Sequence, residues 1–217
     1  MGKRVGVILS GCGFKDGAEI HEAVCTLLAL DRAGAEIVCM APDVDLEVVD
    51  HLTGKTTGEK RNVLVESARI ARGEIKCTSE VRMHDLDALV LPGGFGAAKN
   101  LCDFAEKGAE ATALPDVARL IRACLDQKKP LGAICIAPAV VAAVAGDMSP
   151  KLTIGTDQGT AETLEEMGAR HEAHSVNEIA VDADHRIVTT PAYMLGPSVA
   201  RVSTGIEALV AKVLEMA

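Results

Sequence analysis

The sequence predicts a doubly wound α/β fold, in which a mostly parallel sheet carries helices on both faces. Short runs rich in Val, Ile and Leu recur along the chain, which is typical of strands buried between two layers of helices. Most of these runs are followed by segments in which apolar residues repeat at helical spacing. A sharp strand-to-helix turn is also predicted at Cys135. The 217 residues fit one large domain, so we expect a single domain over residues 1–217.

The first half of the chain begins with a strand, a helix and a second strand, predicted at residues 5–10, 18–32 and 37–41. This order makes a right-handed crossover in a parallel sheet. The polar stretch 43–61 is expected to be irregular. A helix capped by Asn62 is predicted at residues 63–71.

The second half of the chain continues the alternation of strands and helices. Strands are predicted at residues 88–91, directly before Cys135, at 152–154, and in a hairpin formed by 179–181 and 186–189. Helices are predicted at residues 97–104, 115–127, 138–146, 161–167 and 198–216. No repeat or low-complexity linker interrupts this order, which favours one domain.

The composition argues against nucleic acids and anionic membranes as partners. The formal net charge is −9, and no cluster of Lys and Arg stands out. Aromatic residues, which would stack on bases, make up only 2% of the chain.

The cysteines indicate a reduced, cytoplasmic protein. There are seven of them, an odd number, and no spacing matches a disulfide framework or a zinc site, so we expect no metal. An alternative concerns residues 3–12, which resemble a lipoprotein signal that ends at Cys12. Its apolar run is too short for such a signal, and the same residues make a good first strand.

Cys135 is the first candidate for chemistry. Residues 133–137 follow the order small, any, nucleophile, any, small, the pattern of a nucleophile elbow in which a sharp turn exposes one side chain. The helix that Pro138 opens would direct its N-terminal amides at the sulfur and lower the pKa of the thiol. The alternative is an inert core cysteine, because free cysteines are among the most buried residues.

The loops that follow the strands are expected to meet. In open α/β sheets ligands bind beyond the carboxyl ends of the strands. Three loops follow the carboxyl ends of predicted strands: residues 10–17, residues 92–96 and the Cys135 turn. The candidate substrate-binding residues in these loops are Gly11, Cys12 and Gly93.

Glu22 is the candidate acid and base, because its place in the first helix could bring it to the sulfur of Cys135. A carboxyl group buried in an apolar site has a raised pKa, so it holds a proton that it could give to a thiolate and shuttle during turnover. The alternative is a solvated carboxylate on the helix surface. The N–H groups of Gly94 and Ile136 are the candidate oxyanion hole.

Two other chemistries are less well supported. Residues 11–17 are close to a dinucleotide-binding fingerprint, with Asp43 available for a ribose, but one residue too many precedes the last glycine. Asp16 would also stand where a pyrophosphate belongs. A cysteine hydrolase needs a base, yet Ile136 follows the cysteine, and each of the six histidines is expected at the surface. Peptide and amide hydrolysis are therefore not expected.

Together with Cys135 and Glu22, the stretch 91–101 resembles the ThiJ/PfpI-like branch of the class I glutamine amidotransferase-like superfamily. Within this branch it is similar to the ElbB group, named for enhanced lycopene biosynthesis. Further stretches that resemble the group are residues 7–13, 19–24, 51–54, 153–157 and 189–194. The resemblance covers essentially the whole chain.

The resemblance implies a flavodoxin-like sandwich, usually a homodimer, with Cys135 as nucleophile and Glu22 beside it. Similar members are described as cofactor-independent glyoxalases, which convert methylglyoxal or glyoxal and water to lactate or glycolate. A small reactive aldehyde is therefore the expected partner, and no cofactor is expected. Two departures, Ile136 and the Pro-Ala pair at 191–192, stand where related peptidases and amidotransferases carry histidine or glutamate, which argues against glutamine hydrolysis.

We expect the Cys135 thiolate to add to the aldehyde and form a hemithioacetal. The amides of Gly94 and Ile136 would hold its oxyanion, while Glu22 moves a proton between adjacent carbons through an enediol. The alternative from another class is a redox-sensing or protein-quality-control protein, in which Cys135 is oxidised to a sulfinate that Glu22 stabilises.

Overall fold

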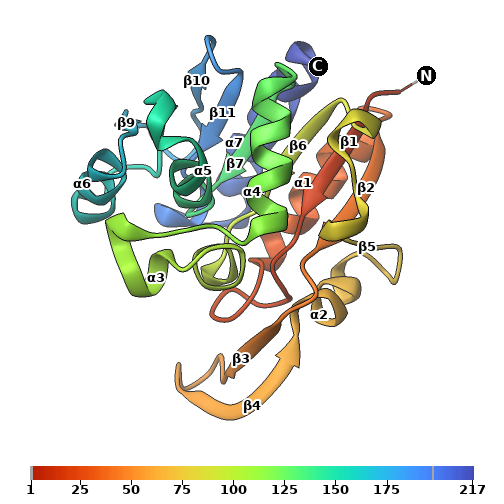
Figure 1. Ribbon diagram of the computed structural model, residues 1–217, viewed down its shortest axis with the longest axis vertical. Coiled ribbons are helices and arrows are strands. Elements are labelled where there is room, and N and C mark those ends of the chain that lie inside the picture. The colour runs from red at the N-terminus through yellow and green to blue at the C-terminus, as the bar shows by residue number, and fades with distance from the viewer. Residues whose placement is uncertain (1, 197) are drawn as a thin grey trace.

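The computed structural model describes residues 2–196 and 198–217. Within these residues a seven-stranded sheet forms the centre of the molecule, in the order β10-β11-β7-β6-β1-β2-β5 (Figure 1). Neighbouring strands run parallel except for β10 and β11. The strands are β1 (Arg4–Ile8), β2 (Glu36–Ala41), β5 (Lys76–Cys77), β6 (Ala88–Leu91), β7 (Leu131–Ile134), β10 (Ala180–Asp182) and β11 (Ile187–Thr190). The prediction of a doubly wound, mostly parallel α/β sheet is confirmed.

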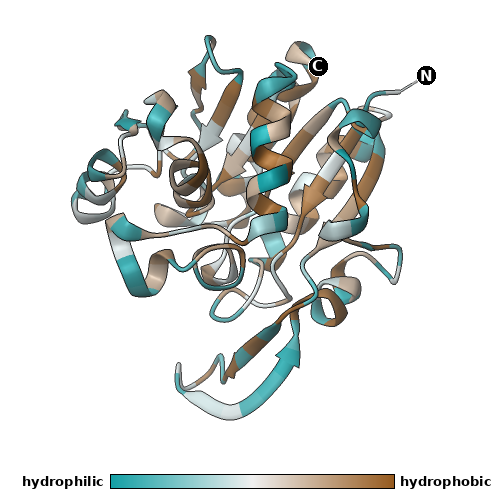
Figure 2. Cartoon of the chain, in the orientation of Figure 1, coloured by the Kyte–Doolittle hydropathy of each residue, from teal (hydrophilic) through white to brown (hydrophobic). Residues whose placement is uncertain are grey.

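Helices cover both faces of this sheet. Leu89 and Leu91 of β6 pack with α4 and α5 on one face, whereas Ala88 and Val90 pack with α1, α2 and α7 on the other. Successive side chains of a strand point to opposite faces, so the continuous apolar run of β6 contributes to both layers. The apolar strands lie at the centre of the hydropathy view in Figure 2. The helices are α1 (Ile20–Arg32), α2 (Val63–Ile70), α3 (Phe104–Lys107), α4 (Pro115–Asp126), α5 (Pro138–Ala145), α6 (Gln158–Glu166) and α7 (Val199–Met216).

The ends of several helices follow local capping signals. The side chain of Asn62 accepts a hydrogen bond from Val65 N–H at the start of α2, as predicted. Helix α6 begins three residues earlier than predicted, because the side chain of Asp157 accepts a hydrogen bond from Thr160 N–H. The helix predicted at 97–104 is divided into a π-helical segment, Ala97–Leu101, and the short α3.

The stretch expected to be irregular contains a hairpin instead. Strands β3 (Asp45–Val49) and β4 (Thr56–Asn62) pair antiparallel and project from the body of the molecule (Figure 1). The prediction failed because β4 reads Thr-Thr-Gly-Glu-Lys-Arg-Asn, without an apolar residue, and most of it is exposed. Residues 56–62 form a strand because their main chain pairs with the more apolar β3.

The last strands lie at the edge of the molecule. The predicted hairpin is confirmed as the antiparallel pair β10 and β11. The strand predicted at 152–154 is shorter and does not join the main sheet, since β8 (Lys151–Leu152) pairs with β9 (Arg170–His171). Among the described residues, no helix combines the length and hydropathy that a membrane span requires.

Candidate active site

Cys135 lies at the turn between β7 and α5, as the elbow pattern predicts. Its backbone has φ of +60°, a left-handed conformation that is strained for a residue with a side chain. Its N–H donates a 2.9 Å hydrogen bond to the carbonyl of Thr190, which fixes the turn against β11. Cys135 is 7% exposed and lines a pocket.

Glu22 reaches Cys135 from the first turn of α1. Its side chain is fully buried and lies beside that of Cys135, because a Cβ on Gly93 would be 2.5 Å from Cβ of Cys135 and 2.7 Å from Oε2 of Glu22. Gly93 N–H donates to Oε2 at 2.9 Å, and Tyr193 N–H donates to Oε1 at 3.1 Å. Burial raises the pKa of Glu22 to about 8, and the nearby charge of Glu19 acts in the same direction. The carboxyl is therefore held by two loops and titrates near neutrality.

The pKa of the Cys135 thiol is raised well above its ordinary value, which contradicts the expected lowering by the helix N-terminus. Burial is the largest cause, and the charge of Glu22 adds to it. The N–H groups of Gly94 and Ile136 lower the pKa of the thiol, but burial and the charge of Glu22 outweigh them. A free thiolate is thus unfavourable in the resting site. Chemistry that uses the sulfur as a nucleophile would need a neighbouring group to accept the thiol proton.

The two predicted oxyanion-hole residues, Gly94 and Ile136, line the pocket together with Cys135 and come from two different loops. Gly94 has φ of +93°, and a Cβ there would lie 2.4 Å from the carbonyl oxygen of Gly17, so only glycine fits. Gly93 is equally confined, because a Cβ would lie 2.5 Å from that of Cys135. Both glycines let the main chain approach the reacting pair closely.

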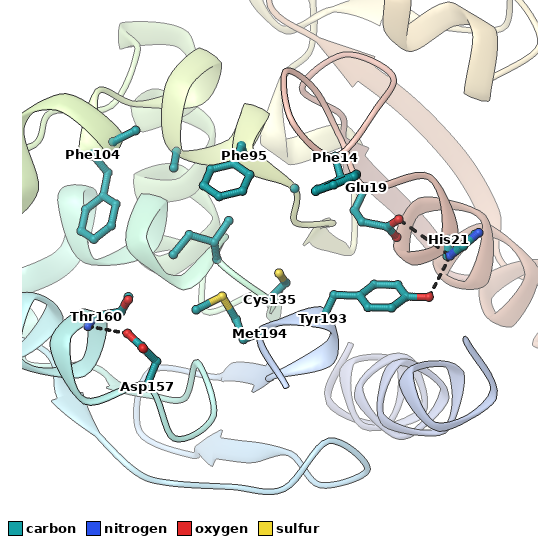
Figure 3. Close-up of a pocket in the computed structure, with 14 residues that line it drawn as sticks. Phe14, Glu19, His21, Phe95, Phe104, Cys135, Asp157, Thr160, Tyr193 and Met194 are labelled. Atoms are coloured by element: carbon teal, nitrogen blue, oxygen red, sulfur yellow. Dashed lines mark hydrogen bonds and ion pairs between the residues drawn. The ribbon is translucent and has the colours of Figure 1, made fainter. Parts of the chain in front are cut away.

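The pocket above Cys135 has a volume of about 810 Å³. Phe14, Phe95 and Phe104 lie along one side in Figure 3, and Tyr193 and Met194 lie across from them. The polar residues of the pocket lie toward its two ends (Figure 3). They are Glu19 and His21 at one end, and Asp157 and Thr160 at the other.

His21 and Tyr193 were not singled out from the sequence as site residues. Nδ1 of His21 lies 2.8 Å from the hydroxyl of Tyr193, and Oε1 of Glu19 lies 3.8 Å from the same nitrogen. His21 was expected at the surface and is indeed half exposed, yet it borders the pocket. The available signal was the tyrosine itself, the only one in the chain.

Gly11 and Cys12, predicted to bind substrate, do not line this pocket. The N–H of Gly11 donates to the hydroxyl of Ser67 in α2, and Cys12 lines a separate pocket of about 230 Å³ beside the β3–β4 hairpin. The loop is turned this way by Asn100, whose side-chain amide donates to the carbonyls of Ser10 and Asp16. The loop therefore contributes Phe14 to the Cys135 pocket instead of its first two residues.

The dinucleotide alternative is not supported by this loop. Asp16 is buried, and its Oδ2 accepts a 2.8 Å hydrogen bond from Val49 N–H, so a carboxylate fills the position where the pyrophosphate would lie. Among the described residues, no group of three or more His, Cys, Asp or Glu could hold a metal ion.

The comparison with known families decides the classification. Residues 7–196 match the DJ-1/PfpI family. This chain belongs to the DJ-1/PfpI family. The predicted resemblance to the ThiJ/PfpI-like proteins is thereby confirmed.

Relatives of this DJ-1/PfpI protein carry several descriptions. The chain is 43% identical to the rat ES1 protein homolog, mitochondrial, over 98% of its length and 84% of the relative. It is also 43% identical to human glutamine amidotransferase-like class 1 domain-containing protein 3, mitochondrial, over 98% and 83%. The structure of an isoprenoid biosynthesis protein with amidotransferase-like domain from Ehrlichia chaffeensis superposes with a TM-score of 0.91 at 39% identity, covering 98% of this chain and 99% of that one.

These relatives correct one prediction. The rat, human and zebrafish proteins are all mitochondrial, which points away from the cytoplasmic location predicted from the cysteines. Scattered free thiols show a reducing environment at most, and they do not separate one reducing compartment from another.

Proposed function

We propose that this DJ-1/PfpI protein is a cofactor-independent glyoxalase that converts methylglyoxal or glyoxal and water to lactate or glycolate. The observation that carries the proposal is the buried carboxyl of Glu22 beside the side chain of Cys135, with the N–H groups of Gly94 and Ile136 acting on the sulfur. Such an arrangement provides a nucleophile, a group that exchanges protons near neutral pH, and donors for an oxyanion.

The first step is addition of the sulfur to the aldehyde carbon. Since burial raises the pKa of the Cys135 thiol, the sulfur attacks as its proton passes to the ionised carboxyl of Glu22. A C–S bond forms, and the electron pair of the carbonyl π-bond moves to the oxygen. The N–H groups of Gly94 and Ile136 stabilise that oxygen, which then takes the proton from Glu22 to give the hemithioacetal.

The second step moves hydrogen between adjacent carbons. Ionised Glu22 removes the proton from the former aldehyde carbon, which gives an enediolate, and returns it to the neighbouring carbon, while the hydroxyl proton of the hemithioacetal passes to the oxygen on that neighbouring carbon. The product is a thioester of the hydroxy acid on Cys135. Water then breaks the C–S bond, releases the hydroxy acid and restores the thiol. Overall, one aldehyde and one water give one hydroxy acid, so no external oxidant or reductant is needed.

The test is methylglyoxal loss and lactate formation without added thiol. We expect Cys135→Ser to reduce turnover to background and Glu22→Gln to reduce it by about 10²- to 10⁴-fold, the usual contribution of general acid–base catalysis. Cys77→Ser is the matched control, because Cys77 lies on β5 at the sheet edge and outside the site. Equal, negligible rates in the native chain and all three variants would refute the proposal.

A redox or quality-control role through oxidation of Cys135 is the competing hypothesis. The Gly94 and Ile136 amides would suit the oxygens of a sulfinate, but burial of the thiol and its raised pKa oppose formation of the reactive thiolate. Selective oxidation of Cys135 by low peroxide, in a chain that does not turn over aldehydes, would favour this role over the enzyme. The predicted homodimer stays a prediction, which the molar mass in solution would test.

A further inference from the structure

The aromatic residues of the chain are concentrated in the pocket above Cys135. The sequence has three Phe, one Tyr and no Trp, and all four aromatic side chains line this pocket. In the described part of the chain, the buried hydrophobic core consists of aliphatic residues, Cys and Met. Aromatic side chains normally dominate cores because they bury much area. Phe104 and Tyr193 also pack against the edges of the core, but the four aromatic side chains share this pocket.

The pocket is large for a substrate as small as methylglyoxal. Its volume of about 810 Å³ falls in the range of sites that enclose drug-sized ligands. The sulfur of Cys135 fixes where the aldehyde carbon must lie, and the remaining space extends between the phenylalanines and Met194 (Figure 3). A methyl substituent would leave most of the apolar surface of the phenylalanines and Met194 in contact with water.

Phe14, Phe95 and Phe104, here called the phenylalanine wall, come from three separate segments of the chain. Phe14 follows β1, Phe95 follows β6 and Phe104 begins α3. Phe14 is 43% exposed and Phe95 is 52% exposed, so apolar area is available for a ligand to cover. The ammonium groups of Lys15 and Lys99 lie 5.0 and 5.7 Å from the centres of these two rings, within the range of cation–π contact.

We propose that the substrates of this site are α-oxoaldehydes with a long apolar substituent, and this inference rests on the proposed glyoxalase function. The aldehyde end would lie on Cys135 and Glu22, and the substituent would lie along the phenylalanine wall. The reaction is unchanged: water adds overall, a C–S bond forms and breaks, and the product is the 2-hydroxy acid that bears the same substituent.

The first experiment compares methylglyoxal, propylglyoxal and hexylglyoxal with the native chain. Each methylene transferred from water to the wall should raise kcat/KM by about fourfold, until the pocket is filled. Phe104→Ala should reduce the increase in kcat/KM with substituent length. Phe104→Leu, which keeps a larger apolar side chain, should retain most of that increase. Val65→Ala, an exposed apolar position on α2 away from the pocket, should leave the series as it is. A flat or falling series, with turnover that still requires Cys135, would overturn the inference and leave the glyoxalase proposal intact.

The second experiment measures binding without turnover. Because Tyr193 is the only tyrosine and the chain has no Trp, its fluorescence reports on the pocket alone. The Cys135→Ser variant is titrated with lactate and with the hexyl homologue of lactate. We expect the hexyl acid to bind at least tenfold more tightly. Tight binding of the hexyl acid with no turnover of any aldehyde would refute the glyoxalase proposal while supporting an apolar ligand; equal binding of the two acids would overturn the inference.

Discussion

The main-chain N–H of Tyr193 donates a 3.1 Å hydrogen bond to Oε1 of Glu22, across 171 positions of sequence. Gly93 N–H donates to the other carboxyl oxygen, so loops after β11 and β6 hold the two oxygens of one group. The carboxyl cannot rotate without breaking a buried hydrogen bond. This constraint fixes the orientation of the Glu22 carboxyl beside Cys135.

The stability of the protein should fall as pH rises through the titration range of Glu22. The folded-state pKa of about 8 lies above the ordinary value of 4.5, so between these values the folded chain keeps a proton that the unfolded chain has lost. The contribution of Glu22 to the free energy of unfolding is therefore fully present below about pH 4.5. Above that pH it declines by up to about 1.4 kcal/mol per pH unit, until the carboxyl of the folded chain ionises. Urea unfolding of the native chain and of Glu22→Gln across this range would measure the decline as a difference. The same slope in both proteins would contradict the assignment to Glu22.

The rate should show the opposite dependence on pH. Only ionised Glu22 can accept the thiol proton, so kcat/KM should rise with an apparent pKa of about 8. Because burial raises the pKa of Cys135, the plateau should continue past 9.0, the ordinary value for a thiol. Stopped-flow or continuous assays over the pH range would measure this. A kcat/KM that stays constant across this range would contradict the assignment to Glu22.

Gly93→Ala should disrupt the site and destabilise the fold. The added Cβ would lie 2.5 Å from Cβ of Cys135 and 2.7 Å from Oε2 of Glu22, so both groups must move. Overpacking of this kind costs about 1–3 kcal/mol, and misplacing the pair should reduce turnover by about 10²-fold or more. Gly159→Ala is the control, since the nearest atom to its Cβ lies 4.0 Å away on the side chain of Asp157. Full activity in Gly93→Ala would mean that the close approach of this loop is not needed.

Asp182→Ala should destabilise the end of the molecule that carries β10. Its buried carboxylate accepts hydrogen bonds from the N–H groups of Lys151, Asp184 and His185. Removing it leaves these donors without their partner, which should cost about 2 kcal/mol or more. Asp184→Ala, at an exposed position of the same turn, should change stability by less than about 0.5 kcal/mol. Urea unfolding of the two variants separates these outcomes.

The central sheet could be predicted because its strands are short and apolar on both faces. The runs at β1, β6 and β7 allow few other assignments, and the elbow at Cys135 is a local pattern of small residues around one position. The β3–β4 hairpin could not be predicted, because pairing is a property of two segments and β4 has no apolar residue.

The sequence predicted that Glu22 and Cys135 lie close together, but it predicted less of what surrounds them. Glu22 and Cys135 follow from the loops at the strand ends, but the direction of the thiol pKa depends on burial, which no local pattern gives. The phenylalanine wall combines three segments far apart in the chain, so it is visible only in three dimensions. Gly11 and Cys12 were misplaced because Asn100, from a distant loop, decides how that turn is oriented.

The groups that hold Glu22 and Cys135 are main-chain amides, contributed by Gly93, Gly94, Ile136 and Tyr193. A substitution at Ile136 or Tyr193 therefore changes the side chain while the N–H donor persists. The phenylalanine wall, by contrast, consists only of side chains. Under the proposed function, reaction chemistry and substrate choice are thus encoded in separate parts of the molecule, and evolution or engineering can vary the second while it leaves the first in place.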